Sequence, residues 1–248
     1  MDMNRSQNAI MEYYFGKSLS VAAKILFIKR NARLSEYKEY LTDCSEFGNV
    51  WRGVTGKLRG EKISIIATGI GPSLVGDCVY ALDRPGAVCL YSGTCGGLHT
   101  SLEIGDYFIA HRAVCGDGFT LHLGYSPMAI TTGDPELIRS LSAALCQMVP
   151  RLDEGLSFTT SSIVREADCD FWDVVDKQCR IIEMGAAPFY AAAQATCKRA
   201  AAYFWVTDLP TSGKNFFDAL SPADIQAKQR NYDSKVLLDL ELLVSLEG

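Results

Sequence analysis

Residues 91–98 read Tyr-Ser-Gly-Thr-Cys-Gly-Gly-Leu, and residues 103–110 read Glu-Ile-Gly-Asp-Tyr-Phe-Ile-Ala. The short apolar run at 88–90, before the first segment, predicts a buried strand. The glycines that follow let the backbone approach another group closely, and Ser92 and Thr94 place hydroxyl groups beside it. Asp106 then opens a second apolar strand. The two segments therefore predict a binding loop at the end of a buried strand.

Length and composition favour one domain over residues 1–248, since 48% of the residues are hydrophobic and can form one large core. No run of about 18 apolar residues is present, and the N-terminus lacks the apolar region of a signal peptide, so we expect a cytoplasmic protein without a membrane partner. The net charge of −5, with both signs interspersed, argues against nucleic-acid binding.

The nine cysteines are scattered and form no Cys-x-x-Cys pair, which favours free thiols over a disulfide framework. The three histidines have no metal-ligand spacing to any cysteine or acid. We therefore expect no metal site.

Predicted strands and helices alternate along the chain. We expect strands at 24–28, 62–67, 88–90, 107–110, 113–114, 157–163, 181–184 and 201–206, and helices at 34–41, 73–82 (capped by Ser73), 135–148, 171–176, 186–196 and 222–246. Such alternation predicts a three-layer α/β/α fold with a central mixed, largely parallel sheet. Ligands bind at the carboxyl ends of the strands in such sheets, which is where the glycine-rich loops at 68–73 and 91–98 fall.

The loop at 91–98 and the Ile-Gly-Asp at 104–106 resemble the nucleoside phosphorylase and nucleosidase superfamily, which includes purine nucleoside and uridine phosphorylases. Further segments, at 69–73, 82–85, 95–98, 104–107, 208–210 and 213–214, look like the catalytic domain of AMP nucleosidases. The resemblance implies an enzyme that breaks the N-glycosidic bond of a purine nucleoside or nucleotide. It implies no resident cofactor, with phosphate a co-substrate only in a phosphorylase. We expect a homo-oligomer, a dimer or a hexamer, because closed symmetry is the norm.

Asp208 is the candidate catalytic acid. It follows an aromatic strand, and purine-acting members of the superfamily have Ser/Thr-Asp at this position. A carboxyl group at a buried strand end can have a raised pKa and donate a proton to a purine nitrogen. The alternative is that Asp208 only begins a turn before Pro210.

Residues 183–185, Glu-Met-Gly, resemble the Glu-Met-Glu with which the family grips the ribose hydroxyls, but Gly185 stands at the second glutamate. Either Glu183 takes over, or the sugar differs, or activity is impaired. Glu183 could instead cap the following helix. The substrate-binding residues that we predict are Arg33, Ile70, Gly93, Thr94, Glu183 and Met184.

The nucleophile that attacks the sugar is either water or phosphate. Phosphorolytic relatives bind phosphate through a Gly-Asp-Pro-x-Arg loop and two further arginines. Here only Arg33 matches, because Tyr91 replaces the second arginine and the third aligns near Asn49, with Arg52 one helical turn away. Anion binding favours a planar cationic fork. We therefore favour hydrolysis, with phosphorolysis as the alternative and a non-catalytic binding protein, suggested by Gly185, as a third possibility.

Overall fold

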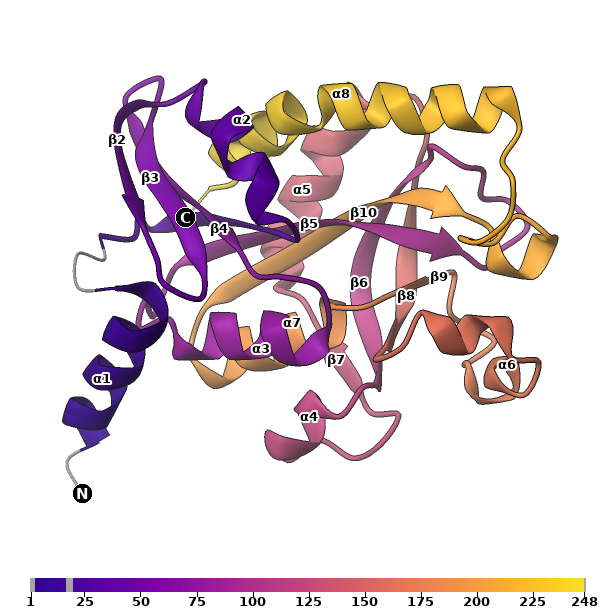
Figure 1. The fold of residues 1–248 in the computed structure, drawn as a ribbon, viewed down its shortest axis with the longest axis horizontal. Helices are drawn as coiled ribbons and strands as arrows, with labels where there is room; N and C mark the ends of the chain where they lie inside the picture. The colour runs from indigo at the N-terminus through magenta and orange to yellow at the C-terminus, as the bar shows by residue number, and fades with distance from the viewer. Residues whose placement is uncertain (1–2, 17–19, 248) are drawn as a thin grey trace.

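The computed structural model describes residues 3–16 and 20–247. Ten strands form one mixed sheet (Figure 1). The strands are β1 (Lys24–Ile28), β2 (Thr42–Phe47), β3 (Arg52–Leu58), β4 (Glu61–Ala67), β5 (Val88–Gly97), β6 (Tyr107–Gly116), β7 (Ile130–Thr132), β8 (Leu152–Thr160), β9 (Ile181–Glu183) and β10 (Arg199–Asp208).

The strand order is β10-β6-β8-β9-β5-β1-β4-β3-β2, with β7 beside β6. Because β10 also pairs with β5, the strands β5, β10, β6, β8 and β9 join in a closed circuit. The central pairs β1–β4, β1–β5 and β5–β10 are parallel, whereas β2–β3, β3–β4, β5–β9, β6–β7 and β6–β10 are antiparallel. The carboxyl ends of β1, β5 and β10 therefore meet at one edge, where parallel sheets place ligands.

Helices cover both faces of the sheet (Figure 1). They are α1 (Met3–Phe15), α2 (Leu34–Lys38), α3 (Pro72–Ala81), α4 (Phe119–His122), α5 (Pro135–Met148), α6 (Phe171–Val174), α7 (Ala186–Ala195) and α8 (Pro222–Ser245), with short 3₁₀ turns η1 (Asn31–Arg33), η2 (Val164–Ala167) and η3 (Pro210–Ser212). One layer holds α3 and α7, with α1 beside α3. The opposite layer holds α2, α5 and α8. This is the predicted three-layer arrangement.

The two cores follow from the alternation of side chains along buried strands. In β1, Ile25 and Phe27 join the core under α3 and α7, while Leu26 and Ile28 join the core under α5 and α8. A strand covered on both faces is apolar at every position, which explains the continuous apolar run in the sequence.

Most predicted elements are present, and α5 has the predicted bounds. Three expectations were wrong. Gly71, not Ser73, precedes α3, and no side chain caps that helix. Residues 107–110 and 113–114 belong to one strand, β6. Arg52 begins strand β3, so it does not lie one helical turn from Asn49.

Asp106 has a structural role. Its Oδ2 accepts a hydrogen bond of 2.8 Å from the Glu103 backbone N–H, and its Oδ1 lies 3.2 Å from Arg151 Nε. The preceding Gly105 has φ +101°, a conformation that favours glycine. The Gly-Asp motif thus builds the turn into β6.

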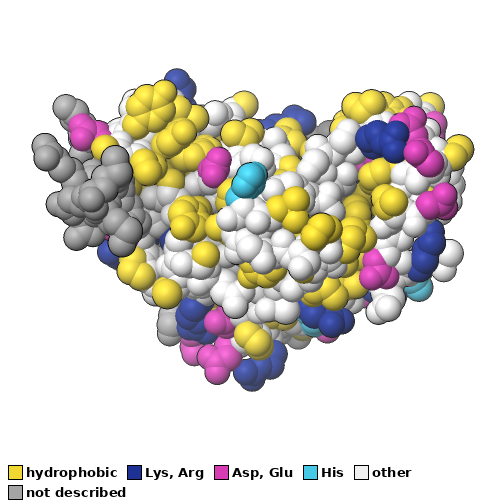
Figure 2. Space-filling model, turned by 90° about the horizontal axis from the view of Figure 1, so that it is seen from below, with side chains coloured by type: hydrophobic (Ala, Val, Ile, Leu, Met, Phe, Trp, Pro, Cys, Tyr) yellow, Lys and Arg dark blue, Asp and Glu magenta, His cyan; other side chains and the backbone are white. Residues whose placement is uncertain are grey.

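Figure 2 shows the face below the sheet, where the Lys and Arg side chains lie in separate groups among Asp and Glu side chains. The dispersal agrees with the mixed charge pattern of the sequence. In the described part of the chain, no helix has the length and apolar character needed to cross a membrane.

Candidate active site

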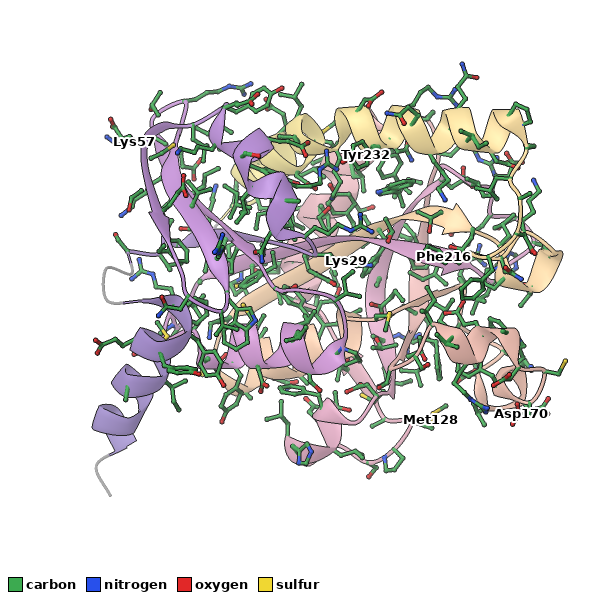
Figure 3. All side chains as sticks on the ribbon, viewed as in Figure 1. Lys29, Lys57, Met128, Asp170, Phe216 and Tyr232 are labelled. Atoms are coloured by element: carbon green, nitrogen blue, oxygen red, sulfur yellow. The ribbon has the colours of Figure 1, made fainter. Side chains whose placement is uncertain are left out.

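A cavity of about 440 Å³ opens at the carboxyl ends of β1, β5, β9 and β10, between α8 and η2. All seven predicted site residues line it, namely Arg33, Ile70, Gly93, Thr94, Glu183, Met184 and Asp208. Figure 3 shows three of its lining side chains coming from separate elements: Lys29 after β1, Phe216 in the loop before α8, and Tyr232 on α8. The fold thus brings together residues that are far apart in the sequence.

Asp208 ends β10 and is only 5% exposed. Its Oδ1 accepts a hydrogen bond of 2.8 Å from the Thr207 hydroxyl. Burial raises the pKa of the Asp208 carboxyl, while the hydrogen bond from Thr207 and the charges of Lys228 and Lys29 act in the opposite direction. A raised pKa favours the protonated form that a general acid needs.

Glu183 is committed to the start of α7. Its Oε2 accepts hydrogen bonds from the backbone N–H groups of Gly185 and Ala186, the latter at 2.7 Å, and its Oε1 accepts one from the Thr159 hydroxyl. These donors are the unpaired N–H groups of a helix N-terminus, so the carboxylate caps the helix. The capping role therefore holds, and both carboxylate oxygens are already occupied at the cavity wall.

Gly185 and Tyr91 form one packing unit. A Cβ at position 185 would lie 2.6 Å from the Tyr91 hydroxyl and 2.9 Å from two of its ring carbons. The Tyr91 ring is buried between Phe189 and Phe204, at centroid distances of 5.3 and 5.7 Å. The two departures from the family pattern are therefore coupled, since Tyr91 occupies the space that a side chain at 185 would need.

Lys29 was not among the predicted site residues. Its Nζ donates hydrogen bonds to the Thr94 carbonyl at 2.8 Å and to the Thr94 hydroxyl at 3.2 Å. Burial lowers the pKa of the Lys29 ammonium to about 8, against the attraction of Glu183. Within the described ranges it has no carboxylate partner at ion-pair distance, unlike Arg33 and Lys235.

Arg33 and Lys235 are both held by carboxylates. The Arg33 guanidinium lies 2.6 Å from Glu36 Oε2, donates to the Tyr232 carbonyl at 3.1 Å, and stacks 4.0 Å from the Tyr232 ring. Lys235 Nζ bonds the Ser92 hydroxyl and lies 2.9 Å from Asp239 Oδ2.

Asp239 is fully buried and also accepts hydrogen bonds from the Tyr37 and Tyr203 hydroxyls. A buried charge with such a complete set of partners holds its neighbour in place. Asp239 therefore fixes Lys235 at the cavity wall.

Glu166 is the second functional candidate that the sequence did not indicate. It lines the cavity from η2, and its carboxylate has no hydrogen bond or ion pair among the described residues. Burial raises the pKa of the Glu166 carboxyl to about 8, and the charge of Asp208 adds to this effect. Two carboxyl groups thus interact at one end of the cavity.

Comparison with known proteins agrees with this architecture. A model of the phosphorylase superfamily matches residues 28–236. The purine nucleoside phosphorylase of DeoD type from Listeria monocytogenes serotype 4a is 26% identical over 221 residues, which cover 83% of this chain and 86% of the relative. The protein of the same name from Mycoplasma pneumoniae is 26% identical over 196 residues, or 77% and 79% of the two chains.

Among solved structures, uridine phosphorylase from Vibrio fischeri ES114 superposes with a TM-score of 0.75 at 17% identity and covers 92% of each chain. At this identity the likeness shows the fold. The family model spans most of the chain, including every predicted site residue. The chain belongs to the phosphorylase superfamily and is an enzyme of that family.

Proposed function

We propose that the chain cleaves the N-glycosidic bond of a purine nucleoside or nucleotide. The observation that carries this proposal is the single cavity that gathers Asp208, Thr94 and the cationic Lys29 at the strand ends. Bond cleavage needs an acid for the leaving base and a polar site around the cation-like sugar. The purine nucleoside phosphorylases among the relatives support a purine base.

Asp208 has the position and the environment of the acid. As the C–N bond breaks, its proton passes to a purine nitrogen, so that the base leaves neutral and the carboxylate remains. The Thr207 hydroxyl, 2.8 Å away, orients the carboxyl group toward the cavity and stabilises its anionic form.

We propose water as the nucleophile. Tyr91 supplies no charge, and the guanidinium of Arg33 is already bound by Glu36 and the Tyr232 carbonyl. A phosphate dianion would lose at least one bidentate contact, which costs about 2–3 kcal/mol or roughly a hundredfold in affinity. Water needs no such contact.

Phosphorolysis is the second candidate, and Lys29 favours it. Two of the three arginines with which phosphorolytic relatives bind phosphate are missing here, but the folded chain places the ammonium groups of Lys29 and Lys235 beside Thr94 and Ser92. A lysine binds phosphate as a point charge. The relatives and structural neighbours that are phosphorylases also favour phosphorolysis.

Product analysis with and without phosphate separates the two mechanisms. Adenosine, inosine and AMP are incubated with the protein, and free base and sugar products are quantified. We expect equal base release in both buffers, with ribose or ribose 5-phosphate as the sugar product. Ribose 1-phosphate as the main product would replace hydrolysis by phosphorolysis.

The matched controls are Asp208→Asn and Asp173→Asn, of which only the first changes a cavity residue; Asp173 is exposed on α6. Release that is lost in Asp208→Asn but kept in Asp173→Asn would assign the activity to this cavity, whereas equal release in both variants would remove Asp208 from the mechanism. If the pure wild-type protein releases no base from any of these substrates, the proposal is wrong.

A further inference from the structure

One end of the cavity, here called the carboxyl end, is lined by two carboxyl groups, Asp208 and Glu166, although the proposed mechanism needs only one acid. Asp208 ends β10 and Glu166 enters from η2, so two separate elements direct carboxyl groups into one space. Neither carboxyl group has an ion pair with a basic side chain in the described part of the chain. Close carboxyl groups without such partners retain a proton between them, because ionising both places two like charges together.

Other charged and titratable groups face this pair from three sides. Lys29 at the end of β1 and Lys228 on α8 attract the Asp208 carboxylate. The buried Cys95 thiol on β5 interacts with Asp208, and burial raises the pKa of that thiol well above its ordinary value. The thiol is therefore neutral at physiological pH. The two lysines oppose the burial that raises the pKa of Asp208, and the charge of Asp208 adds to the effect of burial on the pKa of Glu166.

A carboxyl–carboxylate pair offers one donor and one acceptor side by side. The edge of adenine that carries N7 presents one acceptor, N7, and one donor, the 6-amino group. A 6-oxopurine presents two acceptors there, N7 and O6. A pair that shares one proton therefore matches the 6-aminopurine edge and leaves one carboxylate facing an acceptor in a 6-oxopurine.

We infer that Glu166 is a specificity-determining residue that, together with Asp208, selects 6-aminopurine nucleosides over 6-oxopurine nucleosides. This inference rests on the proposed function and names its substrate class. As the glycosidic bond breaks, the pair gives one proton to N7, and the 6-amino group donates a hydrogen bond to the carboxylate. The water that attacks the anomeric carbon loses one proton, and this proton returns to the pair after the base leaves.

The test is the ratio of kcat/KM for adenosine to that for inosine in the wild type and in Glu166→Gln. The amide of glutamine presents either a donor or an acceptor, so the variant accepts both bases. At about pH 7.5 we expect a wild-type ratio of at least tenfold, falling to about threefold or less in the variant. Asp173→Asn, on the exposed surface of α6, should keep the wild-type ratio.

The pH dependence gives a readout that a merely structural role would not change. The ratio is measured from about pH 7.5 down to about pH 5.5. Acidification favours a second proton on the pair, because burial raises the pKa of both carboxyl groups, and both can then donate to N7 and O6. The wild-type ratio of kcat/KM for adenosine to that for inosine should therefore fall on acidification, because kcat/KM for inosine rises. In Glu166→Gln the ratio should stay flat over the same interval.

Calorimetric binding of adenine and hypoxanthine distinguishes the possible failures. If the protein cleaves purine nucleosides but its ratio is near one, or is unchanged in Glu166→Gln, the inference is wrong and the proposed function stands. If the protein binds neither base and cleaves neither nucleoside, the proposed function itself fails. A folded Glu166→Gln variant that keeps the wild-type preference in both binding and turnover also overturns the inference.

Discussion

The two ends of the cavity handle charge differently. At the carboxyl end, Asp208 and Glu166 have no ion pair, and burial raises the pKa of both groups. At the cationic end, Arg33 and Lys235 are each held by a carboxylate, Glu36 and Asp239. Groups without counter-charges can change protonation during a reaction, whereas paired charges stay fixed. We therefore expect the carboxyl end to exchange protons and the cationic end to position the substrate.

Removing the acid should have the largest effect. Asp208→Asn keeps the shape of the side chain but has no proton to donate at neutral pH, so base release should fall by about 10²–10⁴-fold. Steady-state kinetics measure the loss, and circular dichroism checks that the fold is intact. Turnover equal to that of Asp173→Asn would remove Asp208 from the mechanism.

At the cationic end, removing a charge should mainly change the free energy of unfolding. Asp239→Asn leaves the Lys235 ammonium without its buried counter-charge and should lower the free energy of unfolding by about 3–5 kcal/mol. Urea denaturation measures this change. Asp233→Asn, exposed on the same helix, is the matched control. A loss below about 1 kcal/mol would show that the pair does not hold this end together.

Gly185 and Tyr91 pack against each other and are the sequence neighbours of the cavity-lining residues Met184 and Ser92. Gly185→Ala should cost about 1–3 kcal/mol, because its Cβ would lie within 2.6 Å of the Tyr91 hydroxyl. In a Tyr91→Phe background the nearest atom is gone, so the cost should shrink. Gly118→Ala is the control, because its Cβ would meet nothing within 4 Å. Additive costs in the double-mutant cycle would show that the two positions are independent.

The pH dependence of stability should have opposite signs at Glu166 and Lys29. The folded pKa of Glu166 is raised from 4.5 to about 8, so its contribution to stability is full below 4.5 and is lost as the pH rises through 8. The folded pKa of Lys29 is lowered from 10.5 to about 8, so stability rises with pH between 8 and 10.5. Urea titrations of the wild type, Glu166→Gln and Lys29→Met across pH measure both slopes. Slopes that survive in the variants would assign them to other groups.

The smallest expected effect concerns the sugar. Because Gly185 has no side chain and both Glu183 oxygens cap α7, adenosine and 2′-deoxyadenosine should have kcat/KM values within about threefold of each other. Competition between the two substrates in one reaction measures the ratio directly. A preference for adenosine above about tenfold would require another group to hold the 2′-hydroxyl.

Local patterns predicted much of this fold. Helix α5 was readable because Pro135 begins it and its apolar positions repeat at helical spacing. The hairpin of β2 and β3 was not readable, because β2 is exposed at most positions and has no apolar alternation. Edge strands of this kind are stabilised mainly by pairing with the next strand, and such pairing produces little recognisable pattern in the sequence.

The site residues likewise fall into two groups, those that the sequence predicts and those that only the structure reveals. Asp208, Thr94 and Glu183 lie in motifs beside buried strands, so they could be nominated from the sequence. Glu166 and Lys235 lie in charged stretches that resemble any solvated surface, and only the tertiary packing of η2 and α8 brings them to the cavity. Tyr91 and Gly185 both depart from the family pattern in the sequence, but only the folded structure shows that they are in contact.

The central claim is that the carboxyl end of the cavity holds the purine base. A crystal structure of the wild-type protein with adenine tests it most directly. The account predicts the base between Ile163 and Phe216, with the Asp208 and Glu166 carboxyl groups at hydrogen-bond distance from its N7 and 6-amino group. Adenine bound beside Arg33 and Lys235 instead, or outside the cavity, would contradict the account.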